Sequence, residues 1–279
     1  MHIKKTINAA ATIFVAAVST FFCTNSSAQT FQSRDSINTL IKNSPSFTIY
    51  KDNYFITGIP LNTQPTNYNS DCKFQISFKQ RLTNAVLPFN TFLYLGYTQK
   101  SFWDIYRKSS PFAETNYNPS LGISKFFYFK QKLVSVSVAF EHESNGRDSI
   151  YSRSWNRFAA NWAVEISKRS RLYVCFWIPF QYEGDNPDLL NYVGRLEAAY
   201  QWKTLNQRLV LDLTARKGNK LDWWGSLQTQ LSYRLNKNEN QYITLQWFTG
   251  YAENLVDYKE KTQMLRLGIM IKPSNFIFY

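Results

Sequence analysis

The feature that most constrains this chain is a series of segments, each of roughly ten residues, in which apolar and polar side chains alternate. Such alternation predicts β-strands, because successive side chains of a strand point to opposite faces of its sheet. The segments cover residues 53–60, 71–82, 91–100, 118–128, 132–144, 155–167, 170–182, 191–203, 206–216, 222–235, 241–251 and 262–272. An even number of strands, here twelve, is typical of closed antiparallel barrels in bacterial outer membranes.

Other membrane and fibrous architectures are excluded by composition. No apolar run beyond residue 28 reaches the length of about 20 residues that a membrane-spanning helix needs. Aromatic residues make up 17% of the chain, and Gly and Pro number only 10 and 9, which argues against disorder and collagen-like repeats. We therefore expect an all-β fold, a twelve-stranded antiparallel transmembrane β-barrel.

The connections between the predicted strands also fit such a barrel. Connections after even-numbered strands are mostly very short. Those after odd-numbered strands are mostly longer, namely 101–117, 145–154, 183–190 and 252–261. Short turns at one end and long loops at the other are typical of outer-membrane barrels. With a periplasmic N-terminus, the long loops lie outside the cell. The chain ends in an aromatic segment, 275–279, which resembles the C-terminal insertion signal of such barrels.

The alternating faces separate a membrane barrel from a soluble β-sandwich, which would keep one polar face in water. Segment 132–144 has Val134, Val136, Val138 and Phe140 on one face. Its other face holds serines and Glu141. Charged residues in other segments are expected inside a wet lumen, namely Arg171, Arg195, Glu197 and Asp212.

Three regions follow from this pattern. Residues 1–28 contain two lysines, an apolar stretch and small residues before Gln29, which predicts a secretory signal peptide. Residues 29–52 form a polar periplasmic segment, and 53–279 form the outer-membrane barrel. Removal of the signal peptide leaves His142 as a single histidine, which excludes a multi-histidine metal site. Cys72 and Cys175 are expected to remain unpaired thiols, although export leaves a disulfide open.

One hairpin carries candidate catalytic residues. His142 and Ser144 are two positions apart and share the outward face of their strand. Asn156 has the outward parity of the next strand, so the three side chains can converge on the outer wall near the long loops. A polar cluster on a lipid-facing wall costs free energy, and serine, histidine and an orienting amide are the parts of a serine hydrolase. Taken from the residues alone, a polar cap where a strand meets its loop is an equally good interpretation.

The blocks around this hairpin resemble the outer-membrane phospholipase A family. The segments that carry the resemblance are 97–103, 109–112, 114–117, 142–147, 152–157 and 185–188. The resemblance implies a calcium-dependent phospholipase that hydrolyses acyl esters of glycerophospholipids, with A1, A2 and lysophospholipase activity. It implies that Ser144 is the nucleophile, His142 the base and Asn156 the residue that orients the histidine.

Further roles are implied by the same resemblance. The calcium ligands would be the Arg147 backbone carbonyl, Ser152, Asp185 and Ser109 of a partner subunit, since calcium prefers oxygen ligands. Gln99 matches a family position in the dimer contact, and membrane phospholipids and a second copy of the chain are the expected partners.

Two alternatives remain open beside this hypothesis. A passive outer-membrane barrel, either a pore or a structural module, would need neither the polar triad nor calcium. A lipid A deacylase also places histidine and serine on a barrel wall, but its other motifs are absent here. The net charge of +13 indicates contacts with anionic outer-membrane lipids and a charged lumen; no motif accompanies it that would indicate nucleic acid.

Overall fold

The computed structural model describes residues 37, 39, 41, 43–83, 87–236 and 239–273. The chain divides into two compact units after Ser44, and the strands described below belong to the second unit, Pro45–Tyr279. Within the described residues, no helix is long and apolar enough to span a membrane. The predicted signal peptide, 1–28, and the terminal aromatic segment, 275–279, lie outside the described residues and stay predictions.

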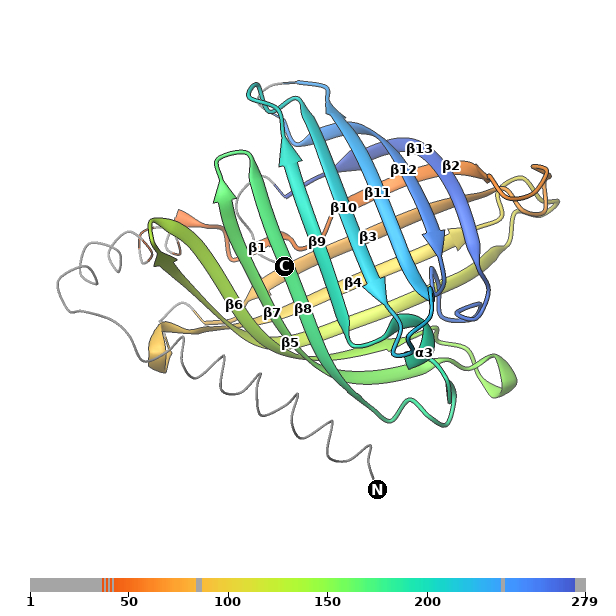
Figure 1. Cartoon of the computed structure of the whole chain (residues 1–279), viewed down its shortest axis with the longest axis horizontal. Helices are drawn as coiled ribbons and strands as arrows, with labels where there is room; N and C mark the ends of the chain where they lie inside the picture. The colour runs from red at the N-terminus through yellow and green to blue at the C-terminus, as the bar shows by residue number, and fades with distance from the viewer. Residues whose placement is uncertain are drawn as a thin grey trace. The chain divides into compact units, whose positions relative to one another are not determined.

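Twelve antiparallel strands form a closed barrel (Figure 1). From β2 to β13 each strand pairs with the next in sequence, and β13 pairs back with β2. Closure satisfies the backbone N–H and C=O groups of the wall, which the hydrocarbon of a membrane cannot do. The strands are β2 (Asn53–Pro60), β3 (Asp71–Arg81), β4 (Phe92–Trp103), β5 (Phe112–Phe129), β6 (Lys132–Ser144), β7 (Ser154–Ser167), β8 (Ser170–Phe180), β9 (Leu196–Lys203), β10 (Leu209–Lys217), β11 (Gly225–Arg234), β12 (Gln241–Gly250) and β13 (Thr262–Ile271). The predicted twelve-stranded antiparallel barrel is confirmed.

A short strand that the alternation did not predict, β1 (Phe47–Ile49), pairs with β3 as well. It lies opposite Phe78–Gln80, whereas β2 lies opposite Asp71–Gln75 on the same strand. Strands β1 and β2 therefore follow one another along one edge of β3. Together they occupy the place of one strand beside β3, with an interruption at residues 50–52.

Two predicted boundaries are wrong by several residues. Strand β5 begins at Phe112 and not at 118, because its pairing with β4 continues beyond the wall. Strand β9 begins at Leu196 and not at 191, because the residues before it form the helical turn α3 (Leu190–Val193). The apolar residues of α3 pack inside the barrel mouth and not in its wall.

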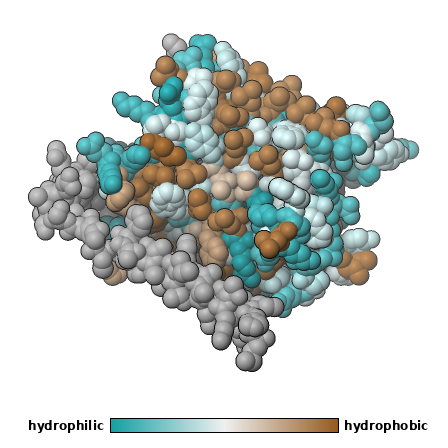
Figure 2. Space-filling model, in the orientation of Figure 1, coloured by the Kyte–Doolittle hydropathy of each residue, from teal (hydrophilic) through white to brown (hydrophobic). Residues whose placement is uncertain are grey.

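The two faces of the wall differ as the alternation predicted. Outward side chains include Val138, Phe158 and Ile178, each a little over half exposed at 52–53%. Inward positions hold small or polar residues, such as Ser137 and Asn161, that are less than a tenth exposed. Figure 2 shows apolar side chains spread over the middle of the visible wall and hydrophilic ones toward the ends of the strands. This distribution fits a wall that faces lipid and encloses a polar lumen.

Charged side chains on the inner face are largely paired. Arg266 contacts Asp71 (Nε–Oδ1, 2.7 Å) and Glu253 (Nη1–Oε1, 2.6 Å). Lys73 also reaches Glu253 (Nζ–Oε1, 3.0 Å). Burial opposes the ionisation of Glu253, but Arg266 and Lys73 outweigh this penalty and lower the pKa of that carboxyl to about 2. Two of the predicted lumen residues are paired as well: Glu197 accepts from Arg216 and Asp212 from Lys272.

The ends of the barrel are unlike. At one end, which we call the short-turn end, connections such as 130–131 and 168–169 have two residues. At the other, the long-loop end, the connections are 61–70, 104–111, 145–153, 181–195, 218–224 and 251–261. The predicted alternation of short and long connections is therefore present.

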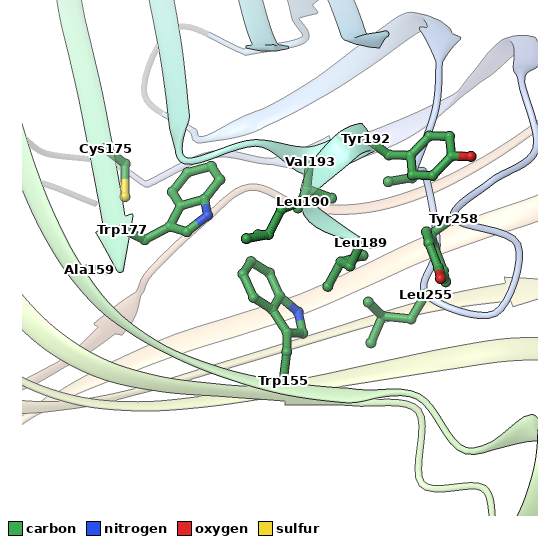
Figure 3. Packing of buried hydrophobic residues seen from close by; sticks show 11 residues of the cluster. Trp155, Ala159, Cys175, Trp177, Leu189, Leu190, Tyr192, Val193, Leu255 and Tyr258 are labelled. Carbon is green, nitrogen blue, oxygen red and sulfur yellow. The ribbon is translucent and has the colours of Figure 1, made fainter. Parts of the chain in front are cut away.

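A hydrophobic cluster occupies the long-loop end of the barrel (Figure 3). It joins Trp155 and Trp177 from the wall to α3 and to Leu255 and Tyr258 of the 251–261 loop. Tyr258 donates a hydrogen bond to Asp188, and Lys259 lies 3.0 Å from the same carboxylate (Nζ–Oδ2). Burial opposes ionisation of Asp188, but these two contacts outweigh it and lower the pKa of Asp188. Two long loops are thus tied together and folded inward.

Candidate active site

His142 and Asn156 lie opposite each other on the paired strands β6 and β7. His142 Nδ1 is 2.9 Å from Asn156 Oδ1, a hydrogen-bond distance. An amide oxygen only accepts, so Nδ1 carries the proton and Nε2 is left with a lone pair. This is the tautomer that a general base acting through Nε2 requires.

Ser144 is the last residue of β6 and lies two positions beyond His142. Its partner on β7 is Ser154, and on the other side Tyr117 of β5 lies opposite it. Paired residues of adjacent strands present their side chains to the same face. His142, Ser144 and Asn156 therefore share the outer wall, continuous with the outward residue Phe140, and each is half-buried. The structure therefore brings His142 and Asn156 into contact and places Ser144 on the same outer face, two positions further along β6.

The inner side of the same hairpin holds a buried ion-pair group. Arg157 lies within 2.6 Å of Glu141 (Nη2–Oε2) and 3.3 Å of Glu143 (Nη1–Oε2). The indole of Trp155 donates to Glu143 (Nε1–Oε2, 3.1 Å). These contacts join β6 to β7 directly behind His142 and Asn156. They fix the register of the two strands on which the outer triad depends.

The loop between β6 and β7 is organised by Asn145, which is buried. Its Oδ1 accepts from the backbone N–H of Arg153 (3.0 Å) and of Arg147 (3.3 Å). Its Nδ2 donates to the carbonyl of Tyr151 (2.9 Å). One side chain thus folds the loop back on itself and brings Arg147 toward the residues that precede β7.

A cluster of oxygen atoms lies where β7 begins. Asp185 Oδ2 accepts from Ser152 Oγ (3.1 Å) and from Ser154 Oγ (2.9 Å). Asn186 is fully buried and holds the backbone carbonyl of Ser154 (Nδ2–O, 2.7 Å). Two hydroxyls and one carboxylate are the oxygen donors that a hard cation such as Ca²⁺ prefers. Within the described part of the chain no group of three or more His, Cys, Asp or Glu side chains gathers to hold a metal, so serines would have to contribute.

The remaining predicted residues have contacts of their own. Ser109 is exposed in the 104–111 loop, with a left-handed backbone φ of 68°. The Arg147 side chain turns to Glu114 (Nε–Oε2, 3.3 Å) and to the carbonyl of Ala113, which leaves its own backbone carbonyl as the predicted ligand. Gln99 is on β4, where its amide accepts from Tyr97 (Oη–Oε1, 3.0 Å) and donates to Ser101 (Nε2–Oγ, 3.3 Å).

Three residues of the site were not predicted from the sequence. Ser154 faces Ser144 across the hairpin, and its outward parity was a signal that could have indicated it. Asn145 acts through hydrogen bonds to backbone within its loop, which spacing does not reveal. Gln181 accepts from the Asn156 amide (Nδ2–Oε1, 3.1 Å), and only the register of β7 with β8 brings these two residues together.

Comparison with known proteins identifies the family. The model of a family described as phospholipase A1 matches residues 32–271. A phospholipase A1 of Salmonella typhimurium is 31% identical over 262 residues, which cover 88% of this chain and 85% of the relative. The chain belongs to the phospholipase A1 family.

Two solved structures of related proteins share the fold. The outer membrane phospholipase dimer of Salmonella typhi with bound calcium has a TM-score of 0.73 and 28% identity, covering 88% of this chain and 99% of that one. An outer membrane phospholipase A of Escherichia coli, described as an active-site mutant with an asparagine replaced by alanine, has a TM-score of 0.74 and 26% identity, again with 88% and 99% covered. The predicted family, phospholipase class and outer-membrane location are confirmed.

The predicted state of the cysteines also agrees with the structure, in which Cys72 and Cys175 are both free and buried.

Proposed function

We propose that this phospholipase hydrolyses acyl ester bonds of glycerophospholipids with Ser144 as nucleophile, His142 as base and Asn156 as the residue that orients the imidazole. The observation that carries the proposal is the 2.9 Å contact between His142 Nδ1 and Asn156 Oδ1 on the outer wall, beside Ser144. Polar groups placed on a wall that otherwise faces lipid need a functional reason.

With its Nδ1 kept protonated by the contact with Asn156, His142 can accept and return a proton through Nε2. His142 Nε2 takes the proton of Ser144 as Oγ bonds to the ester carbonyl carbon, and the carbonyl π electrons move to its oxygen. Collapse of this adduct breaks the bond to the glycerol oxygen, which receives the proton from His142 Nε2. Water then attacks the acyl-serine by the same steps, releasing a fatty acid and restoring Ser144. The partial positive charge that builds on the imidazole is stabilised by the Asn156 oxygen.

The position of Ser144 also bears on the substrate class. It lies on the wall itself at the end of β6, and beyond His142 and Asn156 the outward positions of the same hairpin are apolar, such as the paired Phe140 and Phe158. Long acyl chains can lie along this apolar wall while their ester groups stay at the level of the polar rim. Hydrolysis at both glycerol positions and of lysophospholipids, that is A1, A2 and lysophospholipase activity, is part of the proposal because the family resemblance implies it.

We include calcium dependence in the proposal. Ser152, Asp185 and the backbone carbonyl of Arg147 are the ligands expected from this chain, with Ser109 of the partner subunit completing the set. The shared carboxylate between Ser152 and Ser154 supports the first two, and a relative has been solved with calcium bound. A calcium ion held there would supply positive charge near an oxyanion at Ser144, which the neutral Asn156 does not supply.

Activation by dimerisation completes the proposal. Gln99 faces outward on β4, in register with Ile76 and Tyr117, both of which are exposed on the outer wall. An amide on a lipid-facing wall favours burial against a second barrel, where it can find polar partners. A related structure is described as a dimer.

The test is hydrolysis of a diacyl phospholipid by the refolded chain in detergent micelles, with millimolar calcium and then with excess EDTA. We expect fatty acid to be released with calcium and release to fall to background with EDTA. Absence of release from a folded, dimeric barrel with calcium would overturn the proposed reaction, and equal release under both conditions would overturn the calcium requirement alone.

A further inference from the structure

The orientation of the Asn156 amide decides whether His142 can act as a base. The oxygen and nitrogen ends of an amide have nearly the same shape, so the group can sit in its place in either of two orientations. With Oδ1 toward His142, the imidazole keeps its proton on Nδ1. With Nδ2 in that place, His142 Nδ1 would have to accept, its proton would sit on Nε2, and Ser144 would lose its base.

A second contact fits the first of these orientations. Asn156 Nδ2 donates to Gln181 Oε1 at 3.1 Å, on the side of the amide away from His142. Gln181 follows directly on β8, whose last residue, Phe180, is in register with Asn156. The chain turns at Gln181 with a left-handed φ of 49°, where it leaves the strand for the 181–195 loop. The acceptor is thus held at the rim by the end of a third strand.

We propose that Gln181 is a positioning residue that holds the Asn156 amide in the orientation that keeps His142 Nε2 free to accept a proton. This inference rests on the proposed function, because it assigns a role that acts through Asn156. Its effect on the reaction passes through the hydrogen bond to Asn156.

The chemistry of glutamine gives the proposal a sharp test. Gln181→Met removes the acceptor and keeps a side chain of similar length, so the Asn156 amide is free to rotate. Gln181→Glu keeps an acceptor and cannot donate, so it enforces the productive orientation. Asn156→Asp offers an oxygen in either orientation, so an enzyme with this change no longer needs Gln181. Gln131→Met is the matched control, because Gln131 is also exposed with a left-handed φ (64°) but lies in the 130–131 turn at the short-turn end.

The experiment measures kcat and KM of the full-length refolded protein on a diacyl phospholipid with saturating calcium, for the single variants and for Gln181→Met combined with Asn156→Asp or Asn156→Ala. Gln181→Met is expected to lower kcat about three- to tenfold, the range for one hydrogen bond at a half-exposed site, with KM unchanged. Gln131→Met should retain the wild-type kcat, and Gln181→Glu, which keeps the acceptor, should lose less of kcat than Gln181→Met does. Adding Gln181→Met to either Asn156 variant should cost less than about twofold, since the amide it orients is gone.

The outcomes separate this inference from the proposed function. An inactive wild-type protein overturns the proposed function itself. An active wild type whose kcat is unaltered by Gln181→Met overturns the positioning role. The positioning role is also overturned if Gln181→Met lowers kcat as much in the Asn156→Asp and Asn156→Ala backgrounds as it does in the wild type. The effect would then come from the loop and not from the amide.

Discussion

The two faces of the β6–β7 hairpin carry polar groups of opposite character. Inside, Arg157 is ion-paired with Glu141 and Glu143, and Trp155 donates to Glu143, so the charges are matched and mostly buried. Outside, His142 and Asn156 share a single hydrogen bond, Ser144 stands beside them, and all three are half-buried on a lipid-facing wall. The inner group has the composition of a structural clamp, whereas the outer group, the proposed catalytic residues, leaves an imidazole and a hydroxyl partly accessible on the wall.

The difference shows how one pair of strands can carry a structural ion-pair group on its inner face and the proposed catalytic residues on its outer face. Strand alternation sends each successive residue to the opposite face, so Glu141 and Glu143 act inward and His142 and Ser144 outward. A change on one face should therefore alter one property and spare the other. The predictions below test that separation, from the largest expected effect to the smallest.

Replacing Ser144 with alanine should lower the hydrolytic rate by at least about 10³-fold, because the proposed nucleophile is lost. The urea midpoint of unfolding should stay at the wild-type value, since Ser144 is at the end of its strand on the outer face. Fatty-acid release and unfolding in the same detergent measure both quantities. A rate close to that of the wild type would show that another residue attacks the ester.

Replacing Arg157 with methionine should give the reverse result. The change removes the ion-pair partner of the buried Glu141 and of the half-buried Glu143. This loss is expected to lower the free energy of unfolding by about 2–4 kcal/mol. The rate per folded molecule should change far less than it does in Ser144→Ala. The control is Lys168→Met in the exposed 168–169 turn, expected to stay within about 0.5 kcal/mol of wild type. Equal stability of the two variants would show that the inner group is not a clamp.

The twelve barrel strands and their two faces could be predicted because a barrel wall imposes a strict period of two on every strand. The placement of His142, Ser144 and Asn156 on one face followed from parity within the hairpin. Strand β1 was missed because three residues are too few to show a period. Helix α3 was misassigned to a strand because its apolar residues pack into the barrel mouth, a tertiary preference that local alternation does not report.

The supporting contacts of the site were harder to predict. Gln181 and Asn156 are 25 positions apart and meet only through the pairing of β7 with β8. Asp185 reaches Ser152 and Ser154 across a similar gap, and the residues alone did not indicate that pairing; the family resemblance did for Ser152 and Asp185. Register between strands is therefore the information that the sequence pattern lacked at this site.

Replacing Asn156 with alanine should lower the rate by about 10- to 100-fold and leave measurable activity, because in the proposed mechanism Asn156 orients the base and forms no bond with the substrate. The outer hydrogen bond to His142 is lost while the inner clamp stays, so stability should change by less than about 1 kcal/mol. Steady-state kinetics and urea unfolding test the two statements. An unchanged rate would remove Asn156 from the catalytic group.

Replacing Ser152 with alanine should raise the calcium concentration for half-maximal activity by about three- to tenfold, because one proposed oxygen ligand is lost. The rate at saturating calcium should recover to near the wild-type value, since Asp185 and Ser154 keep their own hydrogen bond at 2.9 Å. A calcium titration of phospholipid hydrolysis gives both numbers. The Ser144→Ala variant, titrated with calcium by the change in its unfolding midpoint, provides a reading of binding without turnover. If adding Ser152→Ala leaves the titration unaltered both in the wild type and in the Ser144→Ala background, calcium binds elsewhere, and the oxygen cluster at the start of β7 is a structural contact.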